Sequence, residues 1–213
     1  TIEGVEGKTV IYAENPVDQT TSVGSYYGKN PIIFVKGGAT PIEVAVKDVQ
    51  FTIKNSPAPA AVDGLTVDGN VTLSLENVVF DGIANTPFTH NGMQSGRCVT
   101  VLGGSILNAE GCTFKNYNKN AVDVFEGGTA NLSNCTVVGN NYNAQKVYDE
   151  TEGTEEEKLA AAYSCSSQNG FVFRTGAAGS VTGCSFSDIT FNLDKGLRQE
   201  KYEQSRAVYL YEP

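Results

Sequence analysis

The sequence has one histidine, His90, and its five cysteines form no CxxC motif and no Cys/His spacing of the kind that binds zinc. Histidines and cysteines clustered at short spacings are the usual ligands of transition metals. The near absence of histidine therefore argues against a histidine-based metal site. We expect these residues to hold no metal and no cofactor.

Long apolar runs and basic clusters are also missing. No apolar segment approaches the roughly 18 residues that span a bilayer, and the opening TIEGVEGKTV has neither the basic nor the apolar region of a signal peptide. Lys and Arg number 15 against 24 Asp and Glu, a formal net charge of -9. Negative charge repels phosphate backbones and anionic lipids. We therefore expect neither nucleic-acid binding nor membrane insertion.

Glycine, in contrast, is abundant, with 23 of 213 residues. Four fifteen-residue segments share one pattern: Gly64–Val78, Cys98–Cys112, Ala121–Cys135 and Gly170–Cys184. Each starts with a small residue, has apolar residues at its second and fourth positions, and ends with Asn or Gly before Val or Cys. Such a repeat without helical periodicity indicates a β-solenoid rather than a sandwich.

Alternation along the first strand of each repeat assigns its faces, because successive strand side chains point to opposite sides. Eight apolar residues are expected to point inward: Leu65, Val67, Val99, Val101, Val122, Val124, Phe171 and Phe173. Residues at the third repeat position are expected to point outward into solvent: Thr66, Thr100, Asp123, Val172 and Tyr209.

A tight bend follows the second strand of each repeat. Its residues are types that enter the left-handed backbone region at low cost, namely Asp48, Asn77, Gly111, Asn134 and Gly183. The shortest repeat spacing, 23 residues between Cys112 and Cys135, suits a three-strand coil, and longer spacings add loops to that coil. We predict an all-β fold, a single parallel β-helix domain over residues 1–213 with about seven rungs.

The phrases LENVVFDGI, AEGCTFKNY and LSNCTVVGNN carry a resemblance over Ile33 to Glu212. The pattern is similar to the right-handed parallel β-helix of the pectate-lyase-like superfamily, and the phrases resemble bacterial cell-surface β-helix modules. This resemblance implies an extracellular or cell-surface location. It does not specify chemistry, because the superfamily includes polysaccharide lyases, glycoside hydrolases, adhesins and modules of unknown role.

Enzymes of this superfamily act over the first sheet with outward carboxylates and basic residues, and the matching candidates here are Asp123, Glu126 and Arg174. A lyase would add calcium, which needs several converging carboxylates, and a hydrolase needs two close carboxyl groups. Asp123 is the only acid at the third position, so neither constellation assembles on the strands. We favour a salt-bridged or solvated surface for these residues.

Large apolar residues on outward positions form a second candidate site. The strip consists of Leu102, Phe125, Val172, Tyr209 and Tyr211. An exposed apolar strip usually marks a covered or binding surface. The cover is either a glycan, a protein partner, or a short helix near residues 154–163, where Thr154 and Glu157 form a capping box.

Several further residues receive structural interpretations. Cys112, Cys135 and Cys184 are expected to form an inward column, with Cys98 also in the core and Cys165 alone accessible. Asp63 and Arg97 are expected to form an exposed inter-rung ion pair of little worth, and His90 to be a solvated loop residue.

The functional prediction is a secreted or cell-surface, non-catalytic module that binds carbohydrate or a host polymer. The alternatives are a polysaccharide lyase or glycoside hydrolase, and a structural or oligomerisation stalk. The last repeat stops in mid-coil at RAVYLYEP, so we expect a cap, a partner or further sequence of a longer chain.

Overall fold

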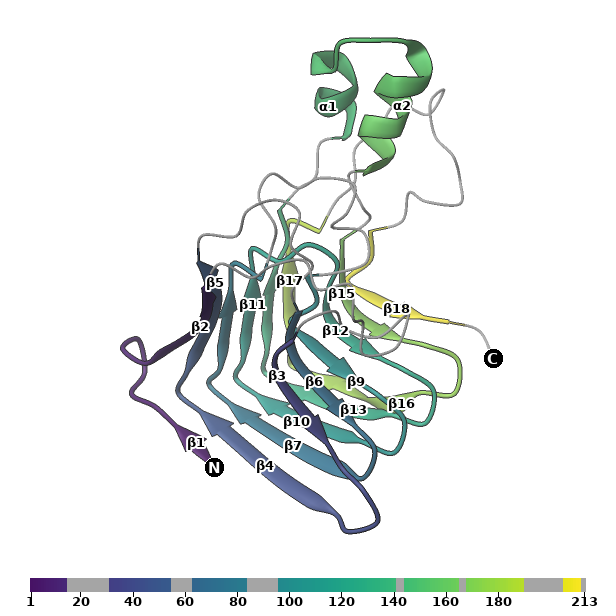
Figure 1. The fold of residues 1–213 in the computed structure, drawn as a ribbon. Coiled ribbons are helices and arrows are strands. Elements are labelled where there is room, and N and C mark those ends of the chain that lie inside the picture. The colour runs from purple at the N-terminus through teal and green to yellow at the C-terminus, as the bar shows by residue number, and fades with distance from the viewer. Residues whose placement is uncertain are drawn as a thin grey trace.

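The computed structural model describes residues 1–14, 31–54, 63–83, 96–140, 144–164, 168–189 and 205–211. Its strands form three sheets of six strands, and every pairing is parallel. The chain visits the three sheets in turn and stacks each coil on the previous one (Figure 1). The predicted parallel β-helix is confirmed, with about six rungs rather than about seven.

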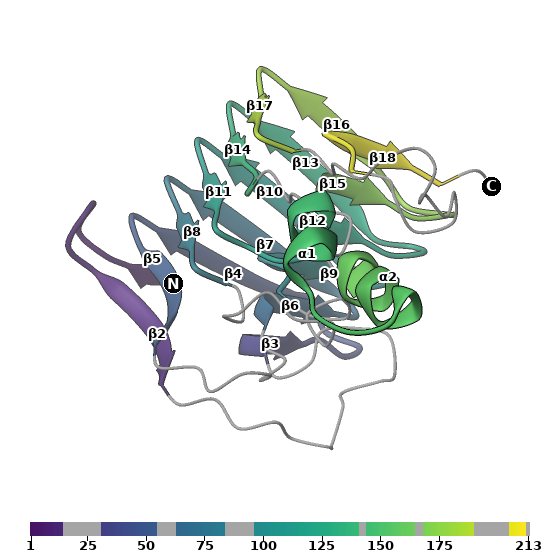
Figure 2. The same cartoon turned by 90° about the horizontal axis from the view of Figure 1, so that it is seen from above.

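Each sheet takes one strand from each coil (Figure 2). Sheet A consists of β1 (Ile2–Glu3), β4 (Ile42–Lys47), β7 (Val71–Glu76), β10 (Ile106–Glu110), β13 (Thr129–Ser133) and β16 (Ala178–Thr182). Sheet B consists of β2 (Val10–Glu14), β5 (Gln50–Lys54), β8 (Val79–Asp81), β11 (Thr113–Lys115), β14 (Thr136–Val138) and β17 (Ser185–Ser187). Sheet C consists of β3 (Pro31–Lys36), β6 (Asp63–Asp68), β9 (Val99–Val101), β12 (Asn120–Val124), β15 (Asn169–Phe173) and β18 (Val208–Leu210).

The register matches the repeat read from the sequence. In sheet C, Val122 pairs with Val99 on one side and with Phe171 on the other. The bend between sheets A and B has a left-handed residue on five rungs: Asp48 (φ 53°), Asn77 (φ 53°), Gly111 (φ 63°), Asn134 (φ 52°) and Gly183 (φ 64°). Equivalent residues therefore lie above one another in columns.

The core is made of these inward columns. The rings of Phe51 and Phe80 stack at a centroid distance of 5.3 Å, and those of Phe80 and Phe114 stack at the same distance. Cys112 and Cys135 are fully buried free thiols, and Cys184 continues their column with its Sγ 3.4 Å from the backbone nitrogen of Cys135. The predicted cysteine column is confirmed, and its role is packing.

The predicted helix is confirmed as α2 (Glu155–Ser164), preceded by α1 (Ala144–Glu150), which was not predicted. Thr154 and Glu157 form the expected capping box, because the backbone nitrogen of Thr154 donates to Glu157 Oε2 (2.7 Å) and that of Glu157 donates to Thr154 Oγ1 (3.3 Å). The two helices pack together and stand beyond the strand ends (Figure 1). Within the described ranges, neither helix is long and apolar enough to cross a membrane.

Candidate functional site

The outer face of sheet C is buried, which contradicts the expected solvent exposure of the third repeat position. Thr66, Thr100, Asp123 and Val172 are each at most 2% exposed. Alternation assigns a side chain to a face but does not say what covers that face. Part of the cover comes from two side chains that bond to Asp123: Arg97, which precedes the neighbouring strand β9, and Asn120, which begins β12 itself.

Asp123 is the centre of the buried polar network. Its Oδ2 accepts hydrogen bonds from Arg97 Nε (2.8 Å), Asn120 Nδ2 (2.8 Å) and Arg174 Nη2 (2.9 Å). Its Oδ1 accepts one from Arg174 Nε at 2.7 Å. Both oxygens of the Asp123 carboxylate therefore accept hydrogen bonds from the protein, three at Oδ2 and one at Oδ1.

The surrounding charges keep Asp123 ionised. Burial by itself would raise the pKa of this carboxyl, but the hydrogen bonds and charges of Arg174 and Arg97 outweigh burial and lower the pKa below its ordinary value. Burial together with Arg97 lowers the pKa of the half-buried Lys119 to about 8. A buried, ionised carboxylate that holds two arginines and an asparagine has the contacts of a structural anchor.

The ion pair of Asp63 and Arg97 is buried, which corrects the expected exposed pair. Their side chains are 0% and 3% exposed, and Arg97 Nη1 lies 3.8 Å from Asp63 Oδ2. The backbone nitrogen of Arg97 also donates to Asp63 Oδ1 at 2.8 Å. Burial raises the pKa of Asp63 to about 6, because the arginine only partly offsets the loss of solvent. The charges of Asp63, Arg97, Asp123 and Arg174 thus alternate in sign across four rungs.

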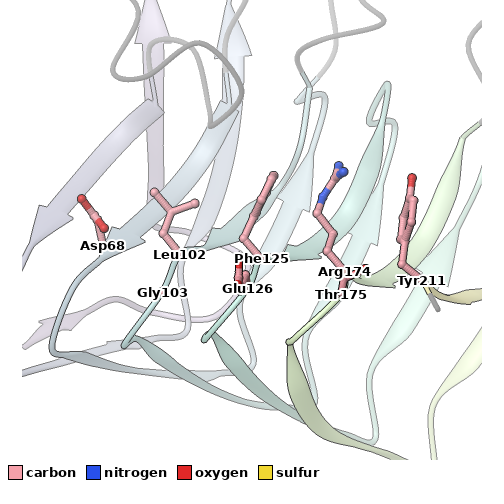
Figure 3. Close-up of a pocket in the computed structure, with 8 residues that line it drawn as sticks. All are labelled: Asp68, Leu102, Gly103, Phe125, Glu126, Arg174, Thr175 and Tyr211. Carbon is pink, nitrogen blue, oxygen red and sulfur yellow. The ribbon is translucent and has the colours of Figure 1, made fainter. Parts of the chain in front are cut away.

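An open groove runs beside this network, at the carboxyl ends of the strands of sheet C. It has a volume of about 590 Å³. Its lining consists of Asp68, Leu102, Gly103, Phe125, Glu126, Arg174, Thr175 and Tyr211 (Figure 3). Five of these residues form one column over five consecutive rungs: Asp68, Leu102, Phe125, Arg174 and Tyr211.

Aromatic rings and guanidinium groups stack along this column. The Arg174 guanidinium lies 4.3 Å from the ring centroid of Phe125 and 5.4 Å from that of Tyr211. Tyr211 stacks on Tyr209 at 4.3 Å, and the Arg206 guanidinium lies 4.1 Å from the ring of Tyr209. Figure 3 shows the side chains of the column standing side by side and projecting the same way. Their faces contact one another, so ring edges and polar tips form the groove surface.

The ligand residues predicted from the sequence are only partly brought together. Leu102, Phe125 and Tyr211 line the groove, although Leu102 is only 7% exposed, which contradicts its expected place on an exposed strip. Val172 is buried beneath it, and Tyr209 is partly buried and stacks behind Tyr211.

The catalytic candidates divide in the same way. Glu126 and Arg174 line the groove, whereas Asp123 lies below its surface. The lining also includes Asp68, Gly103 and Thr175, which no ligand prediction included. The repeat register places Asp68 beside Leu102, and Gly103 and Thr175 directly follow Leu102 and Arg174, so the sequence contained the information needed to include them. His90 and Cys165 lie outside the described residues.

The pair of helices α1 and α2 contributes no residue to the lining of the groove. The pair joins β14 to β15 and therefore stands at the start of the sheet C strands, whereas the groove lies at their carboxyl ends.

Burial raises the pKa of the Tyr211 hydroxyl, which keeps it protonated as a hydrogen-bond donor. The groove thus offers apolar contacts, a hydroxyl, carboxylates and the tip of one guanidinium.

A search of the described residues for three or more His, Cys, Asp or Glu side chains able to hold a metal ion finds no such group. Comparisons of the chain with protein-family models, with curated proteins and with solved structures return no match.

Proposed function

We propose that this chain is a non-catalytic β-helix module that binds a glycan in the groove at the carboxyl edge of sheet C. The observation that carries the proposal is the column of five residues on five consecutive rungs that lines one continuous groove. A secreted or cell-surface location, and kinship with the pectate-lyase-like superfamily, follow from the sequence resemblance and belong to the same proposal.

The spacing of the column suits a polymer of repeating units. Neighbouring strands lie about 4.8 Å apart, so a chain lying along the solenoid axis meets an equivalent position on every rung. Ligand sites typically combine apolar walls with a few polar groups that fix orientation. Here Leu102 and Phe125 supply the apolar wall, and the Tyr211 hydroxyl and the Glu126 carboxylate supply polar contacts.

The state of Asp123 supports binding rather than catalysis. An acid or base must have a proton, or a lone pair, directed at the substrate. Asp123 is buried and ionised and accepts hydrogen bonds from four donors. Two of these bonds come from Arg174 and fix its guanidinium. Of the three catalytic candidates, only Glu126 is exposed in the groove, and hydrolysis of a glycosidic bond ordinarily requires a pair of carboxyl groups.

A glycan array with matched variants tests the proposal. Phe125→Ala and Tyr211→Ala are expected to weaken binding about fivefold each, because each removes an aromatic contact worth roughly 1 kcal/mol. Tyr12→Ala is the control, since Tyr12 is 42% exposed on sheet B while Tyr211 is 41% exposed in the groove. Circular dichroism melting verifies that each variant is folded.

Two outcomes would refute glycan binding. One is an array on which the folded wild-type protein gives no signal for any glycan. The other is a signal that Phe125→Ala and Tyr211→Ala reduce no more than Tyr12→Ala does.

A further inference from the structure

The charges of the groove define which glycans fit it, and this inference rests on the proposed function. The basic side chain in the groove lining is Arg174, and its Nε and Nη2 are held by the two oxygens of Asp123 at 2.7 and 2.9 Å. Its guanidinium is also sandwiched between Phe125 and Tyr211. The Asp123 carboxylate therefore neutralises the charge of Arg174, and the rings of Phe125 and Tyr211 occupy the faces of its guanidinium plane.

The carboxylates of the groove are placed differently. Asp68 is partly exposed, with Lys36 Nζ 3.9 Å from its Oδ2 at the far end of the column. Glu126 is exposed, lies beside Phe125, and makes no ion pair with any described residue. The middle of the groove consequently presents a negative group and a neutralised positive one, in a chain whose net charge is -9.

The backbone makes room for Glu126 to extend toward the next rung. Gly176 has a φ of 76°, and a Cβ at this position would lie 2.9 Å from Glu126 Cγ. A side chain at residue 176 would therefore displace Glu126. Because glycine has no side chain, Glu126 can lie against the turn that follows Arg174 and Thr175.

We infer that the groove selects neutral, hydroxyl-rich glycans over uronic-acid glycans, and that Glu126 is the residue that determines this specificity. Its carboxylate accepts hydrogen bonds from sugar hydroxyls, which are charge-assisted and strong. The same carboxylate repels a sugar carboxylate, and Arg174 cannot compensate because Asp123 already holds it. Glu126 thus acts as a hydroxyl acceptor and an excluder of acidic sugars rather than as a catalytic acid.

The test compares matched pairs of neutral and uronic hexasaccharides with the same backbone linkage: glucan with glucuronan, galactan with galacturonan, and mannan with mannuronan. Isothermal titration of the whole chain at low salt is expected to show at least about tenfold tighter binding of the neutral member of the pair that binds. High salt should narrow this ratio, because screening weakens the repulsion.

Glu126→Gln is the variant, since glutamine retains an acceptor oxygen but carries no charge. It is expected to strengthen uronic-acid binding roughly fivefold and to change neutral binding by less than about threefold. Glu43→Gln makes the same change in net charge at an exposed site on sheet A, away from the groove, and should alter neither affinity.

The outcomes separate the two proposals. Tighter binding of a uronic hexasaccharide to the wild-type chain, or equal effects of Glu126→Gln and Glu43→Gln on the ratio, would overturn the specificity inference and leave glycan binding intact. Absence of binding to every member of all three pairs, with a silent array, would overturn both.

Discussion

Sheets A and C are built from the same repeat with the same parallel pairing, but their outer faces differ. In sheet A, exposure alternates along β7 and β10, so every second residue faces solvent. In sheet C, every residue of β12 and β15 is buried. Both sheets carry polar contacts between rungs. On sheet A they join Asn108, Asn131 and Ser180, and on sheet C they join Asn120 to Asn169 and Asp123 to Arg97 and Arg174.

We expect burial, more than the type of contact, to decide how much each polar contact contributes to the free energy of unfolding. A hydrogen bond or ion pair in water replaces similar interactions with solvent, so its loss costs little. Breaking a buried contact leaves a charged or polar group without solvent or partner. The two sheets offer matched pairs of residues, one buried and one exposed, that test this expectation.

The largest expected effect is that of Asp123→Ala. Arg97 is 3% exposed and would lose the 2.8 Å hydrogen bond that its Nε donates to this carboxylate. The free energy of unfolding should fall by about 3–5 kcal/mol, as for other buried pairs that lose one partner. Urea denaturation followed by circular dichroism measures the change.

The control for this effect is Glu76→Ala, which removes the exposed ion pair of Glu76 with Lys47 on sheet A. Its free energy of unfolding should be indistinguishable from that of the wild type, because both partners are solvated. Equal stability of Asp123→Ala and Glu76→Ala would contradict the buried network on sheet C.

The second effect is a dependence of stability on pH set by Asp63. Its pKa is raised from 3.8 to about 6 in the folded chain, so between pH 4 and pH 6 the folded state holds a proton that the unfolded state has released. The free energy of unfolding therefore falls as pH rises through this window, by roughly 3 kcal/mol for the whole shift. Asp63→Asn should remove this contribution, and asparagine Oδ1 can still accept the bond from the Arg97 backbone nitrogen.

The measurement is a series of urea denaturations of both proteins from pH 4 to pH 7. The wild type should lose stability relative to Asp63→Asn as pH rises, while other carboxyl groups affect both proteins alike. A difference between the two that stays constant across this range would show that Asp63 titrates normally.

The smallest effect compares two asparagines. Asn120 is 1% exposed and connects Asp123 to Asn169, so Asn120→Ala should lower the free energy of unfolding by about 1–3 kcal/mol. Asn131 makes equivalent amide contacts to Asn108 and Ser180 but is exposed. Asn131→Ala should change stability by less than about 0.5 kcal/mol. The reverse order of these two losses would contradict the comparison.

The repeat and its corners could be predicted from the sequence because each is a local rule written once per coil. Alternation identified the inward residues Leu65 and Val99, and the left-handed residue types identified the corner at Asn77 and Asn134. These features depend on backbone geometry, which a short segment determines by itself. The helix α2 was predicted for the same reason, from its capping box.

The state of Asp123 could not be predicted, because it depends on residues far away in the chain. Its partners Arg97 and Arg174 lie 26 and 51 residues away, and only the register brings them to the same carboxylate. The column through Leu102 and Phe125 was recognised, but the sequence did not show that its rings would stack face to face with Arg174.

The exposed core at the last described rung has a mechanical consequence. Val208 and Leu210 are 36% and 67% exposed, while Val122 and Val124, at the same positions two rungs away, are fully buried. In a solenoid each coil is stabilised mainly by its immediate neighbours, so a coil with an exposed core opens locally at a lower free energy than a coil packed on both sides. A ligand that spans five coils would join this coil to the buried ones, and its binding would raise the free energy of that local opening.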